Sequence, residues 1–579
     1  MDEENTVNAT HRSDATLADK EPLQNDMNPV EKKVKMDVEE IAVKTEDMAT
    51  RNIDEESDKP ATLLDVYEAL KDLSTPGSTC SGGVASSLPV LPGLTVEGVG
   101  SVPLPLTQEW VEKLKLVARQ APHGRGMETV VDTSVRNTLQ VDADKVSFQN
   151  PAWHAALIKL TGEAATALGV NAHLVQPKLY KLLLYEKGGF FKKHRDTEKE
   201  DGMFATLVVQ LPSSFTGGSF IVSHNNHSRT FCLDDPATAP YQCHYVAHYA
   251  DCEHEILPVE SGVRLAVIYS LCYTGSETTK PPLNDLSKGS LVAVMNRLDK
   301  SNSLFAIPLH HQYTMASFAR LGVGALKGWD RNLATTISGG ASDGWEMMLI
   351  KVERTDSELE DYYDDDDDFK EGVPEIVQSF HEDGSDASAL RRWMNRHLKF
   401  KSCGDDGMIL ASKDSFDEMW GDEDSSEVLY MGNEGPRRET TYSTYLMVVF
   451  SSHGVFERLC RSDFNGALSM IMMHPEKHLD SALAYMEKAT PPLSSDNFVT
   501  LYELVRSFYP EMESSYWKSL KILVLCLDAQ GVANSAVAAI LASLVKQNGW
   551  TKEETKCIRK HLERFPDLRK TVSAMSKSS

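Results

Sequence analysis

Two histidines and one aspartate near the middle of the chain are residue types that hold a catalytic metal ion. His194 and Asp196 are separated by a single residue, and His254 follows in a later run of strand-forming residues. Side chains two positions apart on a strand point to the same face, so His194 and Asp196 can bind one ion together. Two imidazoles and one carboxylate on one side of an ion suit ferrous iron and leave positions open for a substrate and for oxygen. The sequence therefore predicts a metal site formed by His194, Asp196 and His254.

Arg264 is the residue that we expect to bind an organic acid beside this ion. It lies in an apolar strand-like run, where an unpaired guanidinium group is costly and a carboxylate would satisfy it with two hydrogen bonds. A turn at 259–262 separates it from His254, which predicts that the two residues lie on adjacent antiparallel strands. This placement favours His254 over its neighbours His244 and His248 as the second imidazole ligand.

Two tyrosines precede the first histidine of this set. Tyr185 comes just before the pair Gly188-Gly189. It can hydrogen-bond a ligand at the mouth of a barrel or fill the core as an aromatic side chain, and both interpretations are open at this point. Tyr180 is assigned to the core.

The His-x-Asp spacing occurs at two further places, where it carries less meaning. His381 and Asp383 lie in an acidic, loop-like stretch, whereas His478 and Asp480 lie in a helical pattern. Positions i and i+2 do not face each other on a helix, so the second pair would chelate an ion poorly.

Length, charge and cysteine usage limit the class of protein. A chain of 579 residues is too long for a single core and predicts about two to four folded units. The net charge of −26 argues against duplex nucleic acid or an anionic membrane as a partner, because both bind basic faces. No CxxC pair, signal peptide or membrane-spanning apolar run is present, which predicts an intracellular protein of the cytoplasm or nucleus.

The composition of the chain changes along its length. Residues 1–60 are charged and lack apolar periodicity, which predicts disorder, and 61–105 combine a short helix with a Gly/Ser/Pro-rich linker. Residues 106–275 begin with helices near 107–118 and 151–168 and continue as short strand-like runs separated by turn residues. These runs are 178–184, 203–211, 219–222, 230–233, 243–248, 254–259 and 263–270. Many short strands in succession favour a jelly roll.

The remaining residues have weaker patterns. We expect mixed α/β structure at 276–354, an acidic linker at 355–373, a second mixed α/β region at 374–460 and a helical end at 461–579. Within that end, helices are expected at 495–505 and 532–545, and a last helix should begin at Thr551. The fold class predicted for the whole chain is therefore α+β and multidomain, with a jelly-roll domain in its first half.

Three stretches of the jelly-roll segment resemble the iron(II)- and 2-oxoglutarate-dependent dioxygenases, within the prolyl 4-hydroxylase-like branch. They are LYKLLLYEKGGFFKKHRDTE, ATLVVQLPSSFTGGSFIV and DCEHEILPVESGVRLAVIYSL. The resemblance covers about residues 105–275 and implies a double-stranded β-helix in which His194, Asp196 and His254 hold Fe(II). It also implies that the far carboxylate of 2-oxoglutarate pairs with Arg264 and that Tyr185 helps to hold this cosubstrate.

Two departures from the family bear on the substrate. Residues 207–210 lack the aromatic side chain that close prolyl hydroxylases carry in this strand, which weakens the inference that proline is the target. Ser270 stands where the nucleic-acid demethylase branch has a second arginine, which argues against that branch.

The sequence thus predicts a dioxygenase that uses Fe(II), 2-oxoglutarate and O₂ to hydroxylate a C–H bond, with a protein or peptide side chain as the substrate. Two alternatives remain at this stage. The first is a non-catalytic jelly-roll interaction module, and the second is a small-molecule 2-oxoglutarate oxygenase.

Overall fold

The computed structural model describes residues 60–508 and a few positions beyond them, and the described residues from Ala61 onward belong to one compact unit. The gaps are 126–127, 226, 275–287, 300–302, 341–343, 360–368, 422–424, 431–435, 474 and 489–494, and after 508 only 518–519, 522–523 and 540 are described. The predicted disorder of 1–60 and the predicted helix from Thr551 lie outside the described residues, as does all but residue 540 of the helix predicted at 532–545.

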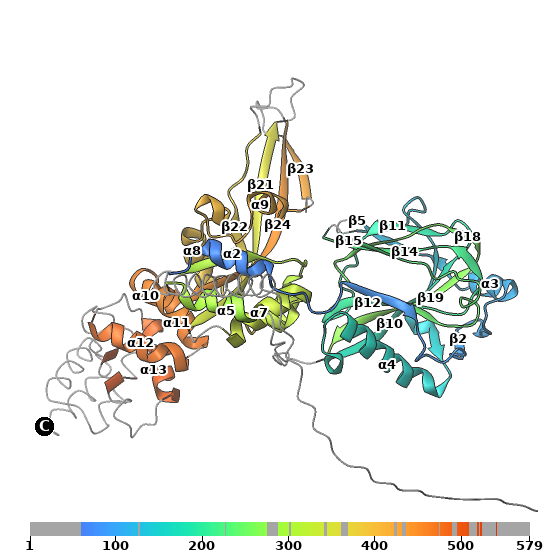
Figure 1. Cartoon of the computed structure of the whole chain (residues 1–579), viewed down its shortest axis with the longest axis horizontal. Coiled ribbons are helices and arrows are strands. Elements are labelled where there is room, and N and C mark those ends of the chain that lie inside the picture. The colour runs from blue at the N-terminus through green and yellow to red at the C-terminus, as the bar shows by residue number, and fades with distance from the viewer. Residues whose placement is uncertain are drawn as a thin grey trace, which may run out of the picture. The chain divides into compact units, whose positions relative to one another are not determined.

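Two antiparallel sheets carry the predicted ligand residues except Asp196, which follows β11 (Figure 1). The order is β1-β16-β12-β19-β10-β8-β4 in the seven-stranded sheet and β15-β14-β17-β11-β7 in the five-stranded sheet. The larger sheet consists of β1 (Cys80–Val84), β4 (Arg119–Gln120), β8 (Leu139–Asp142), β10 (Val175–Tyr185), β12 (Met203–Gln210), β16 (His244–Tyr249) and β19 (Arg264–Tyr273). The smaller consists of β7 (Arg136–Asn137), β11 (Phe190–His194), β14 (Phe220–His224), β15 (His227–Phe231) and β17 (Glu253–Ile256). Side chains of both sheets line one cavity.

Both faces of the central strands are covered, which explains their nearly continuous apolar sequence. Lys181, Leu183 and Tyr185 of β10 line the cavity, so the alternate residues Leu182 and Leu184 turn to the other face. There β10 packs against helix α4 (Pro151–Ala167), whose N-terminus is capped by the Asn150 side chain. Helix α3 (Gln108–Lys115) precedes it, near the position that the sequence predicts.

Residues 75–105 were expected to form a linker, and that expectation is wrong. Strand β1 pairs with β16 and forms an edge of the large sheet. A Cβ atom at Gly82 would lie 2.7 Å from the Tyr245 carbonyl oxygen, so this position needs glycine for the strands to approach. The glycine content that suggested a linker therefore reflects close packing. The same stretch contains β2 (Leu94–Val96) and β3 (Gly100–Ser101), which form a small sheet with β9 (Val146–Phe148).

The turn predicted at 259–262 is also wrong, because these residues form strand β18 (Val259–Gly262) paired with β13 (Phe215–Gly217). Gly262 has a φ of 71°, and a Cβ atom there would lie 2.1 Å from the Ser214 carbonyl oxygen. The chain can thus turn from β18 into β19 at a glycine. As a result His254 and Arg264 belong to different sheets, rather than to adjacent strands of one sheet as predicted. A further hairpin joins β5 (His123–Arg125) to β6 (Glu128–Val130).

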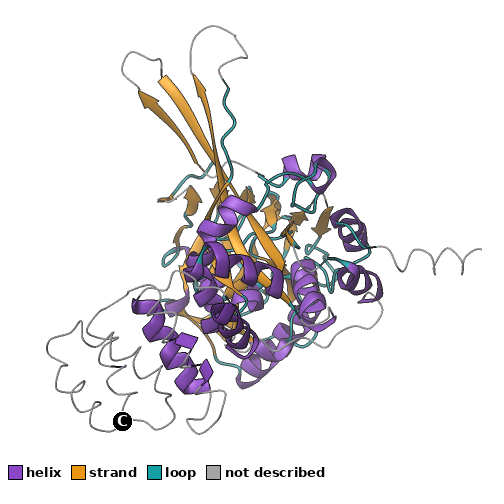
Figure 2. Ribbon diagram, turned by 90° about the vertical axis from the view of Figure 1, so that its left-hand side faces the viewer, coloured by secondary structure: helices purple, strands orange, loops and turns teal. Residues whose placement is uncertain are grey.

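Later residues build a further antiparallel sheet of five strands, of order β20-β24-β21-β22 with β23 also paired to β24 (Figure 2). Its strands are β20 (Leu304–Pro308), β21 (Trp345–Leu359), β22 (Glu375–His381), β23 (Ser425–Tyr430) and β24 (Pro436–Ser451). The acidic linker predicted at 355–373 is wrong at its start, because β21 continues to Leu359 and Asp356 is buried beside Arg354. Residues 360–368 of that segment lie outside the described part of the chain.

Helices pack against the sheet of β20 to β24 and follow it in the chain. They are α2 (Leu63–Lys71), α5 (Lys288–Arg297), α6 (Met315–Leu321), α7 (Gly328–Gly340), α8 (Ser388–His397), α9 (Lys413–Glu418), α10 (Ser452–Ser462), α11 (Phe464–Met473), α12 (Pro475–Lys488) and α13 (Ser495–Phe508). Among them α7 contacts β21, α8 contacts β22 and α10 contacts β24. In the part of the chain that is described, no helix has the length and apolar character to cross a membrane. The described chain is thus a mixed α/β structure built mainly on antiparallel strands.

Candidate metal centre

His194, Asp196 and His254 lie close together in the lining of the cavity. His194 is the last residue of β11 and is paired directly with His254 of β17, and the centroids of the two rings are 4.2 Å apart. The Asp196 Oδ1 atom lies 3.8 Å from His254 Nε2. One donor atom from each of the three residues lies within 4.8 Å of the other two, so a single ion can contact all three.

Asp196 reaches this position differently from the prediction. Strand β11 ends at His194, so Asp196 lies in the following loop rather than on the same strand face. Two hydrogen bonds hold it there. Its backbone N–H donates to the Ala250 carbonyl at 3.0 Å, and the Thr206 hydroxyl donates to Asp196 Oδ2 at 2.5 Å. Partners of this kind orient a ligand carboxylate.

The imidazole rings are oriented so that both can offer Nε2 to an ion. The Nδ1 atom of His194 lies 2.8 Å from the Lys192 carbonyl, and that of His254 lies 3.1 Å from the Cys252 carbonyl. Because a carbonyl only accepts, each Nδ1 must carry the proton, which leaves a lone pair on Nε2.

The electrostatics of the three groups also suit a divalent cation. Burial lowers the pKa of His194 and of His254 to about 4, so both rings are neutral near pH 7. Burial acts to raise the pKa of Asp196, but the neighbouring imidazoles and the Thr206 hydroxyl outweigh it and bring the pKa to about 2. The site therefore presents two neutral nitrogens and one carboxylate, a donor set that fits Fe(II).

We expect the metal-free protein to lose stability as the pH falls from about 6.5 to about 4. The pKa values of His194, His248 and His254 are about 4 in the fold, against 6.5 for an unperturbed histidine. The unfolded chain therefore binds more protons across this interval, and the free energy of unfolding rises with pH until about 6.5. Chemical denaturation of the chelator-treated protein at several pH values measures this slope. The variant His248→Gln removes one titrating ring and should flatten the slope, and an equally steep profile in the variant would contradict the expectation.

Arg264 and Tyr185 meet on the large sheet, directly opposite each other on β19 and β10. The Arg264 side chain is fully buried, and its Nε donates to Gln210 Oε1 at 3.2 Å. Neither its Nη1 nor its Nη2 has a hydrogen-bond partner among the described residues, and the same holds for the Tyr185 hydroxyl. The guanidinium carbon lies 5.3 Å from the centroid of the Tyr185 ring. A buried cation without a counter-charge is strongly unfavourable, so this geometry fits a carboxylate that accepts from both nitrogens.

One cavity of about 630 Å³ contains all five of these residues. His254 and Arg264 face it from different sheets, so the small sheet supplies the imidazoles and the large sheet supplies Arg264 and Tyr185. The volume is in the range of pockets for small organic ligands. The structure therefore brings together every residue that the sequence analysis selected for the site.

Several residues of the cavity are placed differently from their predictions or were missed. Tyr180 lines the cavity as a half-buried residue, so its assignment to the core is wrong. His248 also lines it, with its ring centroid 4.2 Å from that of His254 and its Nε2 without a partner among the described residues. Sequence reasoning missed Lys181 and Arg136. Lys181 has the same strand parity as Tyr185 within an apolar run, which is a signal that could have found it.

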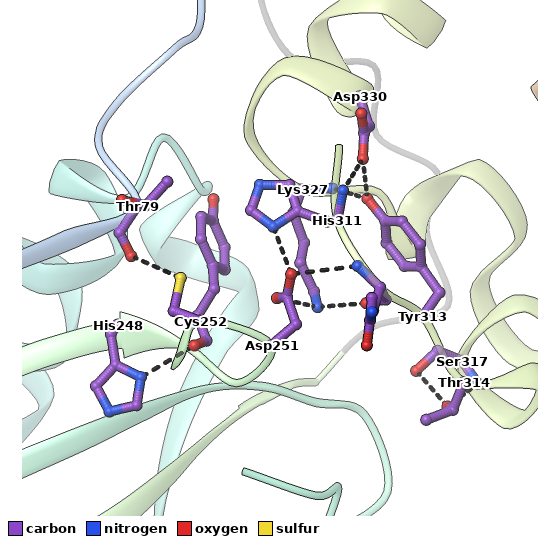
Figure 3. A network of polar contacts seen from close by, with 12 residues as sticks. Thr79, His248, Asp251, Cys252, His311, Tyr313, Thr314, Ser317, Lys327 and Asp330 are labelled. Carbon is purple, nitrogen blue, oxygen red and sulfur yellow. Dashed lines mark hydrogen bonds and ion pairs between the residues drawn. The ribbon is translucent and has the colours of Figure 1, made fainter. Parts of the chain in front are cut away.

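A second cluster of possible metal-binding groups consists of His224, Asp251 and His311, none of which lines this cavity. Figure 3 shows Asp251 and His311 with the residues around them. The Asp251 carboxylate is already paired, with Lys327 Nζ at 2.8 Å from Oδ1 and His311 Nδ1 at 2.8 Å from Oδ2. Although burial acts to raise it, Lys327 and His311 hold the pKa of Asp251 well below its usual value. The Lys327 ammonium supplies the counter-charge that an ion would bring, so we interpret the cluster as an ion-pair network.

This network and a neighbouring contact hold both loops that flank the predicted metal ligands. Asp251 lies in the turn between β16 and β17. Glu198, two residues after Asp196, accepts hydrogen bonds from Thr314 at 2.8 Å and from Ser317 at 2.5 Å. Figure 3 shows Thr314 and Ser317 on the same segment as His311 and Tyr313. Residues 311–327 therefore contact the chain on either side of the site.

Comparison with known proteins adds little to this geometry. No family model and no curated protein matches the chain. Among solved structures, a prolyl-4-hydroxylase from Pseudomonas putida is 18% identical, covers 36% of this chain and 98% of its own, and has a TM-score of 0.24. An oxidoreductase of the 2OG-Fe(II) oxygenase family from Burkholderia pseudomallei is 16% identical over 29% of this chain and 80% of its own, with a TM-score of 0.18. A prolyl hydroxylase from Trichoplax adhaerens, in complex with a hypoxia inducible factor peptide fragment, is 13% identical over 33% and 87%, with a TM-score of 0.21. Scores this low carry no argument, so what the site can do follows from its own residues.

Proposed function

We propose that this chain is an Fe(II)- and 2-oxoglutarate-dependent dioxygenase with a jelly-roll core, and that it hydroxylates a C–H bond of a protein side chain. The observation that supports it most is the pairing of two features in one cavity. A compact set of two imidazoles and a carboxylate lies near a buried arginine whose two Nη atoms have no partner among the described residues. A metal ion and a dicarboxylic acid together satisfy both features.

Each residue has a defined task in this proposal. His194, Asp196 and His254 hold the ion on one side and leave the side toward the cavity open. Arg264 and the Tyr185 hydroxyl bind the far carboxylate of 2-oxoglutarate and so orient its other end toward the ion. When bound, the iron with its cosubstrate and O₂ supplies the oxidising chemistry that yields succinate, CO₂ and a hydroxylated product. Apolar side chains such as Leu183 and Val208 keep water out of the cavity.

The non-catalytic alternative, an interaction module, explains less. A module that has lost its chemistry does not need Arg264, since an apolar side chain of similar volume would remove an uncompensated buried charge. A small-molecule oxygenase uses the same metal and cosubstrate, and it is distinguished by its product.

Succinate formation from 2-oxoglutarate tests the proposal. The full-length protein should form succinate only when Fe(II) is added, and His194→Ala should reduce this to background because the site loses a ligand. His227→Ala is the matched control, since His227 is an exposed residue of β15. Equal succinate from the wild type and His194→Ala would refute a catalytic role. Mass spectrometry for the gain of one oxygen, on peptide and metabolite mixtures, then separates a protein substrate from a small molecule.

A further inference from the structure

Arg136 and Lys181 are two buried cations that face the cavity and that the proposed chemistry does not use. Each side chain is 7% exposed, and both line the cavity. Lys181 Nζ donates to Gln140 Oε1 at 3.1 Å. Arg136 Nη1 donates to the Pro122 carbonyl at 2.8 Å, and its Nε has no partner among the described residues. No carboxylate of the described chain forms an ion pair with either of them.

The fold brings these two cations to the same edge of the cavity. A single residue, Thr138, separates strand β7, which holds Arg136, from β8, and β8 pairs with β10 at Lys181. Burial lowers the pKa of Lys181 to about 7, and the positive charge of Arg136 acts in the same direction. The residue opposite Lys181 in β8 is Asp142, but its carboxylate binds Arg119 at 2.8 and 2.9 Å. The charge of Arg136 therefore acts on Lys181. Asp142 and Asp196 act on the pKa of Lys181 in the opposite direction, but among the described residues neither carboxylate forms an ion pair with Lys181.

Their environment differs from that of the other cations in the cavity. Lys193 and Arg195 share the Glu253 carboxylate, at 2.5 and 3.6 Å, and Lys199 donates to the Thr197 hydroxyl. Among the described residues that line the cavity only Asp196 is acidic, although the whole chain has a net charge of −26. Uncompensated positive charge is thus concentrated where a ligand would bind, and an anion attracted there gains from the low-dielectric surroundings.

Arg136 and Lys181 lie apart from Arg264 but close to the proposed metal ligands. Lys181 precedes Tyr185 by four residues on β10, which is about 13 Å along a strand. A single carboxylate is too small to contact both Lys181 and Arg264, which lies opposite Tyr185. Arg136 lies 4.3 Å from the centroid of the Phe191 ring, and that ring stacks on His194 with centroids 3.4 Å apart. One aromatic ring therefore separates Arg136 from a ligand of the ion.

We propose that Arg136 and Lys181 form a second anion-binding subsite, which binds a carboxylate of the substrate while Arg264 holds the cosubstrate. The inference rests on the proposed function and narrows its substrate to one with an acidic group near the oxidised carbon. An acidic peptide and a small organic acid both provide that group. The bound carboxylate accepts from Lys181 Nζ and from the free Nε of Arg136, and it supplies the counter-charge that the cavity lacks.

Titration calorimetry with the full-length protein tests the subsite. The protein is loaded with Mn(II), which replaces iron without redox chemistry. It is also loaded with N-oxalylglycine, a 2-oxoglutarate analogue that should bind Arg264. The probes are a blocked peptide Glu-Glu-Pro-Glu-Glu, the same peptide with glutamine in place of glutamate, and glutarate. We expect the glutamate peptide to bind at least tenfold more tightly than the glutamine peptide. Lys181→Met and Arg136→Gln should each abolish most of this difference in affinity between the two peptides.

Controls separate the subsite from general effects of mutation. Lys159→Met alters an exposed lysine of α4 and should retain the ratio, as should Lys181→Arg, which keeps the charge. Thermal denaturation checks that the variants are folded. Glutarate that binds with the same dependence on both cations, when the peptides do not bind, supports the subsite and identifies a small acid as its ligand. The inference is overturned if the two peptides bind equally and glutarate does not bind. It is also overturned if Lys181→Met and Arg136→Gln both keep the preference for the glutamate peptide.

The loading step tests the proposed function independently. A wild type that binds Mn(II) and N-oxalylglycine but shows no preference for acidic probes retains the proposed function and loses the subsite. If the wild type fails to bind N-oxalylglycine but prefers the glutamate peptide through Arg136 and Lys181, the subsite is retained and the proposed function is refuted.

Discussion

Replacement of Arg264 with methionine is expected to stabilise the ligand-free protein and to abolish its response to 2-oxoglutarate. The guanidinium group is fully buried, and its only hydrogen bond to the described residues is the one from Nε to Gln210. Removal of an uncompensated buried charge in favour of an apolar side chain of similar volume should raise the free energy of unfolding by about 1–4 kcal/mol. The same change removes the proposed partner of the 2-oxoglutarate carboxylate, which should weaken 2-oxoglutarate binding by about 2–5 kcal/mol, or roughly thirtyfold or more.

Thermal denaturation with and without Mn(II) and 2-oxoglutarate measures both effects at once. A ligand that binds only the folded state raises the melting temperature, so the wild type should respond to 2-oxoglutarate and Arg264→Met should not. Arg461→Met is the matched control, because Arg461 is an exposed residue of α10 paired with Glu457. It should leave the cosubstrate response intact. A destabilised Arg264→Met protein that still responds to 2-oxoglutarate would show that the arginine is structural.

The variant Lys327→Met is expected to destabilise the protein by about 3–5 kcal/mol, because it leaves the Asp251 carboxylate buried without its main counter-charge. The two side chains are 8% and 7% exposed, and their charged atoms lie 2.8 Å apart. Lys327 Nζ also donates to the Gln312 carbonyl at 3.0 Å, so two interactions are lost. The midpoint of chemical denaturation, compared with that of the wild type, gives the change.

Two comparisons show whether the buried charge is the cause. Lys113→Met removes an ion pair with Glu109 whose side chains are 41% and 73% exposed, and exposed pairs contribute about 0–1 kcal/mol. The double variant Asp251→Asn/Lys327→Met removes both charges and should recover part of the loss. A loss from Lys327→Met no greater than that from Lys113→Met would contradict the expectation.

The sequence predicted individual strands better than their pairing. Strand β12 (Met203–Gln210) differs by one residue from the run predicted at 203–211, because alternation and turn residues are local signals. The membership of His254 and Arg264 in different sheets was not predictable, since it depends on β18 pairing with the distant strand β13. Likewise, glycine-rich composition could not distinguish a linker from a closely packed edge strand such as β1.

The site was predictable to a similar extent. Residue types and spacing selected His194, Asp196, His254 and Arg264, and the family resemblance added Tyr185; the fold brings all five into the lining of one cavity. The loop position of Asp196 was missed, because the hydrogen bond from Thr206 joins residues on different elements. Arg136 was missed for the same reason, because it is an ordinary charged residue locally. Lys181 did carry a local signal, its strand parity with Tyr185, but only the packing of β7, β8 and β10 makes Arg136 and Lys181 a pair.

The contacts of Thr314 and Ser317 with Glu198, and of Lys327 with Asp251, bear on how the chain can be divided. A fragment that ends at residue 275 would contain every predicted ligand and yet lack the partners that hold the two loops beside them. Asp251 would then meet water in place of an ammonium group. The two sheets that line the cavity and the segment after them therefore form one module in energetic terms, and gene fragments meant to isolate the candidate site should extend beyond Asp330.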